Sequence, residues 1–404
     1  MVFDQMNKES IIESTIKCLD WIEKQMLTYN YGSWGIYERI RIDKNIRVNW
    51  VRPDCNAEFA RVLSEFRTVT KEDRYNKLFN NITEWLFKAQ DNNELSAWYG
   101  SFPFYYTDGN TMLPADNPAI FQNDNGKVLM SLIDLYRATK NETFLNRALM
   151  LADYWIRIQR PEGYFFWNDG GKTQTAYKGP CFVLWLAAGL IMCYTTTGNE
   201  KYKKSAYLAY DYVLRLQLDN GRILTTYEIE KIEDWRPASS EAAIALYTFS
   251  KAYNEVHDLK FLDPIKKTGN YLLSLQDKCG GILNCDNDSM MASLQNDKNL
   301  CDLVYTQGFA LMGLSEAAKA TGESIFISGA CNLAGFLIKI QCNGESDLWD
   351  GAWRGSYNIT TWQWDGRADQ NNPIDEGGMY SVYTGWCAAT IMYGLLSVYQ
   401  LIKP

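Results

Sequence analysis

Histidine is nearly absent from this sequence: His257, in the segment EVHDLKF, is the only one in 404 residues. The charged residues beside it predict a short surface connector. Mechanisms that need an active-site imidazole, and zinc sites built from Cys and His, are therefore disfavoured. The ten cysteines include no CxxC pair and several lie in apolar runs, so we interpret them as buried thiols rather than disulfides or metal ligands.

Other absences narrow the function further. The net charge is -8 and no basic run occurs, which argues against a nucleic-acid partner because phosphate binding needs a basic face. The opening MVFDQMNKESIIES lacks the basic start and apolar core of a signal peptide, and no stretch reaches the roughly 18 uninterrupted apolar residues of a membrane span. We therefore expect a soluble, cytoplasmic protein with no membrane partner. No DxDD or DDxxD cluster supports terpene cyclisation.

What the sequence does contain is one phrase in six copies: an apolar helical run that closes with glutamine and is often followed by glycine. WIRIQRPEGYF, VLRLQLDNGRI and YLLSLQDKCGGI are three of them. The intervals between the closing glutamines are 58 to 69 residues, so six units fill the chain. These glutamines are Gln25, Gln90, Gln159, Gln217, Gln276 and Gln341.

Each unit also supplies a second helical run, rich in Ala, Gly, Leu and Met. Several of these runs are apolar nearly all round, which is typical of helices surrounded by protein, whereas the first run is amphipathic, as in ESTIKCLDWIEKQ. Six outer and six inner helices predict an all-α (α/α)6 toroid. Because each unit must bury its apolar face on its neighbours, we expect residues 1–404 to form one domain. The inner runs begin near Asp54, Asp124, Gly179, Ser239, Tyr305 and Tyr383.

The connections are of two kinds. Those from inner to outer helix are short and charged, such as TKEDRY and KNETF, whereas those from outer to inner helix run to about 20 to 40 residues. The long loops must emerge on one rim, beside the N-termini of the inner helices. Nine of the 14 tryptophans fall in these loops, and indole rings suit the C–H faces of sugars. We therefore place a carbohydrate site at this rim, although such rings also pack long loops onto a barrel.

The sixfold phrase alternating with Ala/Gly-rich inner helices resembles the six-hairpin glycosidase superfamily over essentially the whole sequence. In particular the chain looks like the unsaturated glucuronyl and rhamnogalacturonyl hydrolases of glycoside hydrolase families 88 and 105, which are cytoplasmic. The resemblance implies a catalytic aspartate at the mouth near the start of an inner helix, and Asp54 and Asp124 occupy such positions. That family also uses histidine near its site, which this sequence cannot match. Lyases and epimerases share the toroid as well.

Carboxylates remain the groups suited to proton transfer. Glycosidic cleavage usually needs an acid and a base or nucleophile on either side of the scissile bond. Our catalytic candidates on the long-loop rim are Asp54, Asp124, Glu241 and Asp375. The first three have a structural interpretation too, because acidic residues in the first turn of a helix cap it or offset its dipole. A helix N-terminus also favours the ionised carboxylate, so Asp54 or Asp124 would serve more naturally as base or nucleophile.

Arginine and aromatic residues on the same rim are the candidates for substrate binding. WVRPD and DWRPA repeat one phrase before two inner helices, and a guanidinium binds a sugar carboxylate with two hydrogen bonds. Equally, each arginine could pack on its tryptophan and pair with a nearby aspartate. DGAWRGSYNITTWQWDGR is the strongest candidate for a sugar-binding flap. The full set is Trp50, Arg52, Trp98, Tyr177, Trp235, Arg236, Trp353, Arg354, Trp364, Tyr380 and Tyr383.

The sequence thus predicts a glycoside hydrolase that cleaves a short, uronic-acid-containing oligosaccharide by Asp/Glu acid–base chemistry. Two alternatives stay open: a polysaccharide lyase or sugar epimerase in which Tyr and Arg act instead, and a non-catalytic carbohydrate-binding toroid. An oligosaccharide is the expected partner. No cofactor or metal is assigned, although rim carboxylates would permit calcium.

Overall fold

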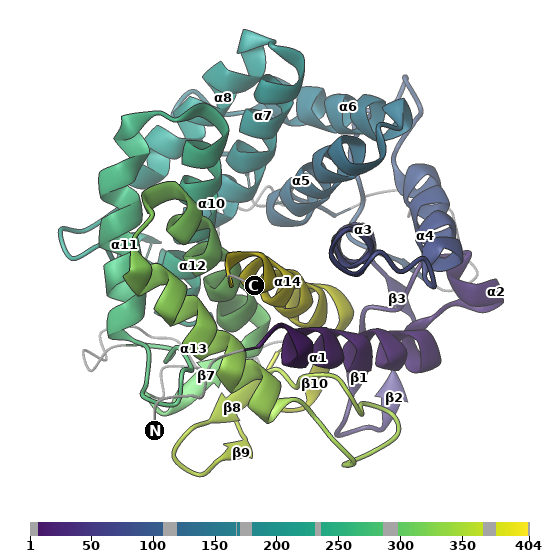
Figure 1. Cartoon of the computed structure of the whole chain (residues 1–404). Helices are drawn as coiled ribbons and strands as arrows, with labels where there is room; N and C mark the ends of the chain where they lie inside the picture. Colours follow the sequence, from purple (N-terminus) through teal and green to yellow (C-terminus); the bar gives the residue numbers. More distant parts are fainter. Residues whose placement is uncertain are drawn as a thin grey trace.

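The computed structural model describes residues 7–107, 119–166, 168–169, 180–230, 236–285, 298–366 and 377–402. Three candidate residues, Tyr177, Trp235 and Asp375, lie outside these ranges. Within them, helices alternate between an outer and an inner ring (Figure 1). The outer helices are α1 (Lys8–Trp21), α4 (Asn76–Ala89), α6 (Glu142–Ile158), α8 (Glu200–Leu214), α11 (Leu262–Ser274) and α13 (Ser324–Ile340).

The inner helices form a closed ring. They are α3 (Pro53–Thr70), α5 (Gln122–Thr139), α7 (Val183–Thr197), α10 (Ala238–Val256), α12 (Gly308–Thr321) and α14 (Thr390–Leu401). Each contacts the next, and α14 returns to α3. This is the predicted (α/α)6 toroid. The inner helices begin where the sequence indicated, except that π-helical turns, Leu303–Gln307 and Thr384–Ala389, precede α12 and α14.

The repeated glutamines join one outer helix to the next. The Gln90 amide donates to the backbone oxygen of Arg147 in α6, Gln159 to that of Ser205 in α8, and Gln276 to that of Gly329 in α13. Gln217 bonds Pro264 and Thr268 of α11 in the same way, and Gln341 reaches Ser14 of α1 at 2.9 Å, which closes the outer ring. Gln25 departs from the pattern, because its amide bonds Asp347 of the preceding unit.

The glycine of the phrase has a steric reason. At Gly221 φ is +89°, and an added Cβ would lie 2.0 Å from the Lys267 backbone oxygen; at Gly163 the corresponding distance to Leu208 is 2.1 Å. Any side chain would therefore push the loop away from the neighbouring outer helix. The recurring Gln and Gly of the sequence are the contacts between successive hairpins.

Short connectors and long loops separate onto opposite ends of the barrel, as predicted. Five inner helices, all except α14, end in a left-handed residue: Lys71, Lys140, Gly198, His257 and Gly322. A left-handed residue is a common helix terminator. His257 therefore terminates α10 at the end opposite the long loops, and its backbone N–H bonds Tyr253.

Short strands occur in the long loops. They are β1 (Arg39–Arg41), β2 (Ile46–Arg47), β3 (Trp50–Val51), β4 (Tyr106–Thr107), β5 (Ile120–Phe121), β6 (Asn168–Asp169), β7 (Leu300–Asp302), β8 (Ser356–Asn358), β9 (Gln363–Trp364) and β10 (Ser381–Tyr383). They pair antiparallel as β10-β1-β2, β3-β4, β5-β6 and β7-β8-β9. The β1–β10 pair connects the first and last units. Two further short helices are α2 (Tyr29–Gly32) and α9 (Thr226–Glu230).

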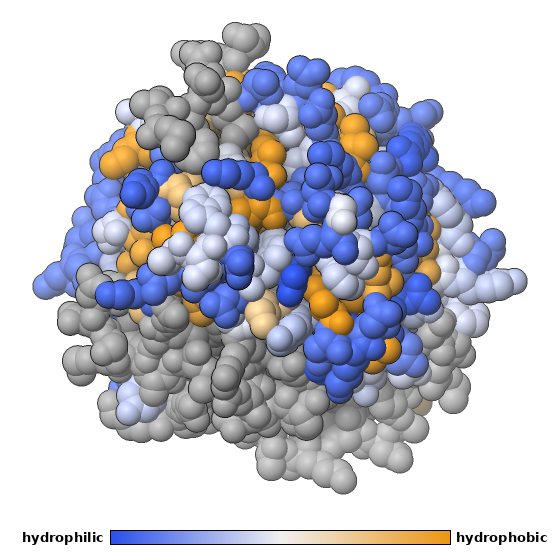
Figure 2. Space-filling model, turned by 90° about the horizontal axis from the view of Figure 1, so that it is seen from below, coloured by the Kyte–Doolittle hydropathy of each residue, from blue (hydrophilic) through white to orange (hydrophobic). Residues whose placement is uncertain are grey.

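The segment Pro180–Thr197, which contains α7, is long and apolar enough to cross a membrane, but 78% of it is buried inside the toroid. Its composition is that of a core helix. The side of the barrel that carries α1 and the β1–β2 and β8–β9 hairpins is mostly hydrophilic in its described part, with hydrophobic residues in small separate patches (Figure 2). This agrees with outer helices that turn their apolar stripe inward.

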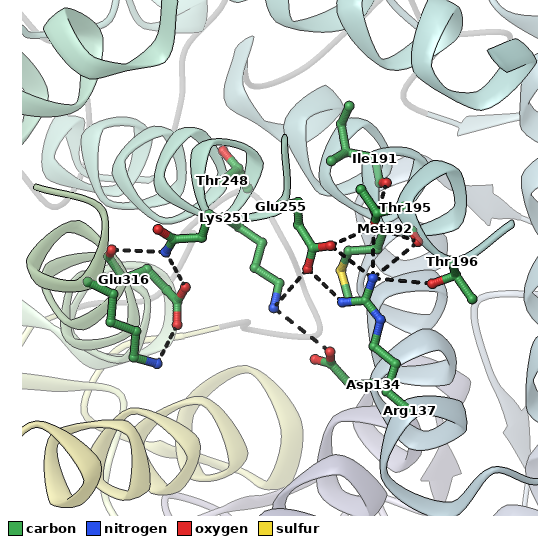
Figure 3. Close-up of polar contacts among 12 residues, drawn as sticks. Asp134, Arg137, Ile191, Met192, Thr195, Thr196, Thr248, Lys251, Glu255 and Glu316 are labelled. Atoms are coloured by element: carbon green, nitrogen blue, oxygen red, sulfur yellow. Dashed lines mark hydrogen bonds and ion pairs between the residues drawn. The ribbon is translucent and has the colours of Figure 1, made fainter. Parts of the chain in front are cut away.

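Charged side chains close the barrel at the short-connector end (Figure 3). Lys251 of α10 lies 3.8 Å from Asp134 of α5 and 3.7 Å from Glu255, which also pairs with Arg137 at 2.6 Å. We call this group, together with Arg61, Tyr393, Glu316, Asn254, Lys319 and Thr195, the basal network. Arg61 of α3 pairs with Asp134 at 2.8 Å and stacks on Tyr393 of α14, and Glu316 of α12 bonds Asn254 and Lys319. With Thr195 of α7 bonding Glu255, all six inner helices take part.

Candidate active site

Arg52 organises the long-loop end of the inner barrel. It is the last residue before α3, where Pro53 starts the helix, and its side chain is 7% exposed. The guanidinium donates to both carboxylate oxygens of Asp54 at 3.0 and 2.7 Å, and to Glu38 at 2.8 Å. It also lies 2.9 Å from Asp124. Burial opposes its charge, but Asp124 and Asp54 raise the pKa of Arg52 well above its usual value, so it stays a cation.

Asp54 lies in the first turn of α3 and is held in its ionised form. Besides Arg52, it accepts a 2.6 Å hydrogen bond from the indole N–H of Trp386. Burial raises the pKa of this carboxyl, but the charges of Arg52 and Lys127 and the indole bond lower it below the ordinary value. The predicted pairing of the arginine with its own aspartate is therefore what the structure contains, and Asp54 suits the role of base or nucleophile.

Asp124, in the first turn of α5, brings a second carboxylate to the same place. Its Oδ1 accepts from Asn123 at 2.8 Å, and its Oδ2 lies 2.9 Å from the Arg52 Nη2 atom, which is also 2.7 Å from Asp54 Oδ2. The two oxygens are thus separated by no more than the sum of these distances, about 5.6 Å. Retaining glycosidases hold their carboxyl groups about 5 to 5.5 Å apart. The structure thus brings Asp54 and Asp124, both candidates from the sequence, onto one nitrogen of Arg52.

The second WRP phrase builds a smaller copy of this arrangement. Arg236 lies 2.9 Å from Glu241 in the first turn of α10, and its guanidinium carbon lies 4.1 Å from the centroid of Phe182. The other Glu241 oxygen accepts the backbone N–H of Cys181 at 2.9 Å. Glu241 is only 1% exposed. Both arginines proposed for uronate recognition are therefore engaged by carboxylates of the helix that each one precedes.

Trp386, in the turn before α14, forms the aromatic floor of the site. Its ring lies 5.4 Å from Tyr305 and 6.1 Å from Phe182, and the Lys127 ammonium is 3.5 Å from its centroid. The π-helical turns before α12 and α14 therefore each place an aromatic ring here, and such turns are frequent at functional sites. Lys127 also pairs with Glu58 at 2.7 Å.

Two buried carboxyl groups near this floor hold their protons more tightly than usual. Burial raises the pKa of Glu58, one turn after Asp54 on α3, although Lys127 opposes the shift. Burial also raises the pKa of Asp302 to about 7, against hydrogen bonds from the backbone of Tyr305 and Val304. Carboxyl groups of unequal pKa in one site are the arrangement that acid–base catalysis uses.

Gln122, the first residue of α5, is fully buried, and neither its amide oxygen nor its nitrogen makes a hydrogen bond in the described structure. A buried amide without partners is costly unless something else bonds it. Because it lies two residues before Asp124, a substrate hydroxyl is a suitable partner. Gln122 was not among the residues predicted from the sequence.

The remaining substrate-binding candidates fall in three places. Trp50 stacks on Tyr105 at 4.3 Å beside the Arg52 cluster, and the Tyr383 hydroxyl is bonded by Arg39 in the same region. Arg354 and Trp364 lie together in a groove on the outer rim. Trp98 and Tyr380 are partly exposed, and neither lines that groove.

Trp353 was predicted to bind substrate, and the structure contradicts this prediction. Its ring is fully buried and its indole N–H bonds the backbone oxygen of Leu337 at 2.8 Å. It therefore packs the loop onto α13 instead of offering a face to a sugar, which was the structural alternative for these tryptophans.

Sequence reasoning also missed Glu38, Lys127, Trp386 and Asp302. Sequence position was the only signal that could have indicated any of them. Asp302 lies directly before the π-helical turn that precedes α12, and Trp386 lies within the one that precedes α14. Among the described residues, no group of three or more His, Cys, Asp or Glu side chains is arranged to hold a metal ion.

The chain has the six-hairpin glycosidase fold. A sugar epimerase from a ruminal bacterium superimposes with a TM-score of 0.75, at 12% identity over 98% of this chain and 99% of that one. An unsaturated glucuronyl hydrolase from Streptococcus agalactiae gives 0.66 at 17% identity, covering 99% and 94%. The GH76 α-mannanase of Bacteroides thetaiotaomicron gives 0.67 at 14%, covering 98% and 96%. No family model and no curated protein matches the chain.

Proposed function

We propose that the protein is a glycoside hydrolase that cleaves a short oligosaccharide at the mouth of the toroid. The observation that carries the proposal is the meeting of Asp54 and Asp124, from neighbouring inner helices, on one nitrogen of Arg52. The structural neighbours with this fold include two kinds of hydrolase. The single histidine lies at the opposite end, so carboxyl groups are the proton-transfer groups that the chain offers here.

In this proposal Asp54, kept ionised, acts as nucleophile or base, and Asp124 acts at the other side of the glycosidic bond. Arg52 contacts both carboxyl groups and so holds them in one place. Trp386 holds Asp54 through its indole N–H, and the half-buried Trp50 supplies aromatic surface for a sugar ring. Recognition of a uronate gains little support from Arg52 and Arg236, since both are already paired.

The test is turnover of an oligosaccharide panel that contains neutral mannosides and glucosides as well as unsaturated uronides, followed by chromatography of the products. Asp54→Asn and Asp124→Asn should each lower kcat about 10²- to 10⁴-fold on any cleaved substrate. The matched control is Asp153→Asn, whose carboxylate is 51% exposed in an ion pair with Lys201 and should not matter. Each site variant removes one of the carboxylates that neutralise the buried charge of Arg52, so circular dichroism is needed to check that the variants fold. Full turnover by both folded variants contradicts the proposal.

A sugar epimerase or isomerase is the second candidate. Two structural neighbours, a sugar epimerase and a D-mannose isomerase with TM-scores of 0.75 and 0.71, favour it, as does Asp302, whose pKa of about 7 suits proton exchange at neutral pH. Incorporation of solvent deuterium into an uncleaved sugar would support this candidate over hydrolysis.

A further inference from the structure

A second hollow lies outside the ring of inner helices, where the end of α13 meets the β8–β9 hairpin. It is an open groove of about 500 Å³ whose walls include Lys339, Glu345, Arg354, Tyr357, Trp362 and Trp364. We propose that this groove is a second carbohydrate-binding site, which holds a sugar unit of an oligosaccharide away from the mouth. The choice of ligand class rests on the proposed function, but the site and its residues do not include Asp54 or Asp124.

Tyr357 fixes the orientation of the two tryptophans. Its ring stands at 87° to Trp364 with centroids 5.0 Å apart, and at 78° to Trp362 with centroids 6.1 Å apart. Edge-to-face contacts of this kind stabilise aromatic pairs and hold their planes. Trp362 remains 42% exposed. The groove therefore presents rigid aromatic surface to solvent, which is what the C–H face of a sugar ring requires.

The backbone of Trp362 is itself informative. Its φ of +56° lies in the left-handed region, which bulky side chains rarely adopt and which costs on the order of 1 kcal/mol or more. Asn358 holds this turn by accepting the backbone N–H groups of Thr360 and Thr361. Glycine would suit position 362 best for folding alone. An exposed tryptophan at such a position points to a use for its ring.

Polar groups surround the aromatic surface. The Trp364 indole N–H donates to Glu345 at 3.1 Å, and Arg354 lies 3.4 Å from the other Glu345 oxygen. The Lys339 ammonium is 4.1 Å from the Trp362 centroid. A few oriented polar groups beside aromatic rings are typical of sites that bind hydroxylated ligands.

The segments that form the groove walls lead along the chain to the candidate active site. Arg354 donates at 2.7 Å to the backbone oxygen of Met379, and from there the chain runs through β10 to Trp386. The groove wall β8 pairs with β7, which leads into Tyr305. The walls of the groove are therefore continuous along the chain with two aromatic residues of the candidate active site.

The experiment uses Asp124→Asn protein, so that hydrolysis does not consume the ligand, and titrates it by calorimetry with mannohexaose, cellohexaose, maltohexaose, xylohexaose and tetragalacturonate. At least one should bind. Adding Trp362→Gly should weaken this binding about tenfold, or remove one of two sites, while the melting temperature stays equal or rises because glycine relieves the left-handed strain. Tyr29→Ala, which removes a ring that is 74% exposed elsewhere, is the matched control and should leave binding unchanged.

Two outcomes overturn the proposal: no oligosaccharide of the panel binds, or one binds with the same affinity and stoichiometry after Trp362→Gly. Its failure is distinguishable from failure of the proposed hydrolysis. The hydrolysis is judged by turnover in the wild-type protein and its Asp54 and Asp124 variants, whereas the groove is judged by binding in a protein that needs no turnover.

Discussion

The two ends of the inner barrel use the same kinds of charged side chain for different purposes. At the short-connector end, the basal network draws a side chain from each of the six inner helices, and its cations favour the ionised acids. Lys319 and Lys251 lower the pKa of Glu316 to about 2 against the effect of burial, and Arg137 lowers that of Glu255. At this end the charged side chains therefore serve to join neighbouring inner helices.

At the long-loop end the carboxyl groups differ from one another. The pKa of Asp54 is lowered by Arg52, whereas burial raises that of Glu58 and brings that of Asp302 to about 7. Gln122 is left without a hydrogen bond. Uneven protonation and a buried amide without a hydrogen bond are expected where a ligand completes the site.

The largest expected effect is on the basal network. Lys251→Met leaves Asp134 and Glu255 with fewer cations, and breaking such a buried group should lower the free energy of unfolding by about 3 to 5 kcal/mol. Urea unfolding measures it. Lys201→Met, at an ion pair about half exposed, is the control and should change stability by less than about 1 kcal/mol. If the folded Lys251 variant also lost kcat, the two ends would not be independent.

Asp302 should make stability depend on pH in the opposite direction to ordinary acid unfolding. Its carboxyl binds protons more tightly in the folded state, so its contribution is full below about pH 4 and is lost as pH rises through about 7. A shift of this size corresponds to about 4 kcal/mol. Asp302→Asn keeps an oxygen that accepts the Tyr305 N–H, and it should abolish this loss of stability with rising pH. Identical melting curves for both proteins from pH 4 to 8 would contradict the assignment.

Glu316 should contribute the reverse dependence. Its folded pKa of about 2 lies below the ordinary value of 4.5, so the stabilisation is present above pH 4.5 and is lost as pH falls toward 2. The difference corresponds to about 3 kcal/mol. In melting experiments, Glu316→Gln should be less stable than wild type at pH 7 and should converge with it near pH 2. Parallel curves would show that the carboxylate is not held by its lysines.

The smallest stability change is expected at Gln122. Gln122→Leu replaces a buried amide that has no partner with an apolar side chain of similar size, so stability should change by less than about 1 kcal/mol or rise. KM for a cleaved oligosaccharide should increase while the melting temperature holds. A large loss of stability with unchanged KM would mean that the amide supports the fold instead of the substrate.

The repeat was predictable because each hairpin makes the same contact with the next one. The same Gln and Gly residues are therefore required in successive units, and the sequence repeats them. Asp54 and Asp124 were predictable from their places at helix starts. Glu38 was not, since it reaches Arg52 through a loop pairing that the sequence did not indicate: its backbone N–H bonds Trp50 at 2.8 Å, and Tyr37 pairs with Val51. Trp353 looked like its neighbours in a tryptophan-rich loop, and only packing separates a buried ring from one that faces a ligand.

The bond from Gln341 to Ser14 has a consequence for chain order. It makes the junction between the last and first outer helices equivalent to most of the other junctions, and Lys8 lies 4.7 Å from the ring of Tyr399, so the two ends of the described chain are neighbours. A circular permutant that links these ends and opens a connector such as Gly198–Asn199 should therefore assemble the same ring.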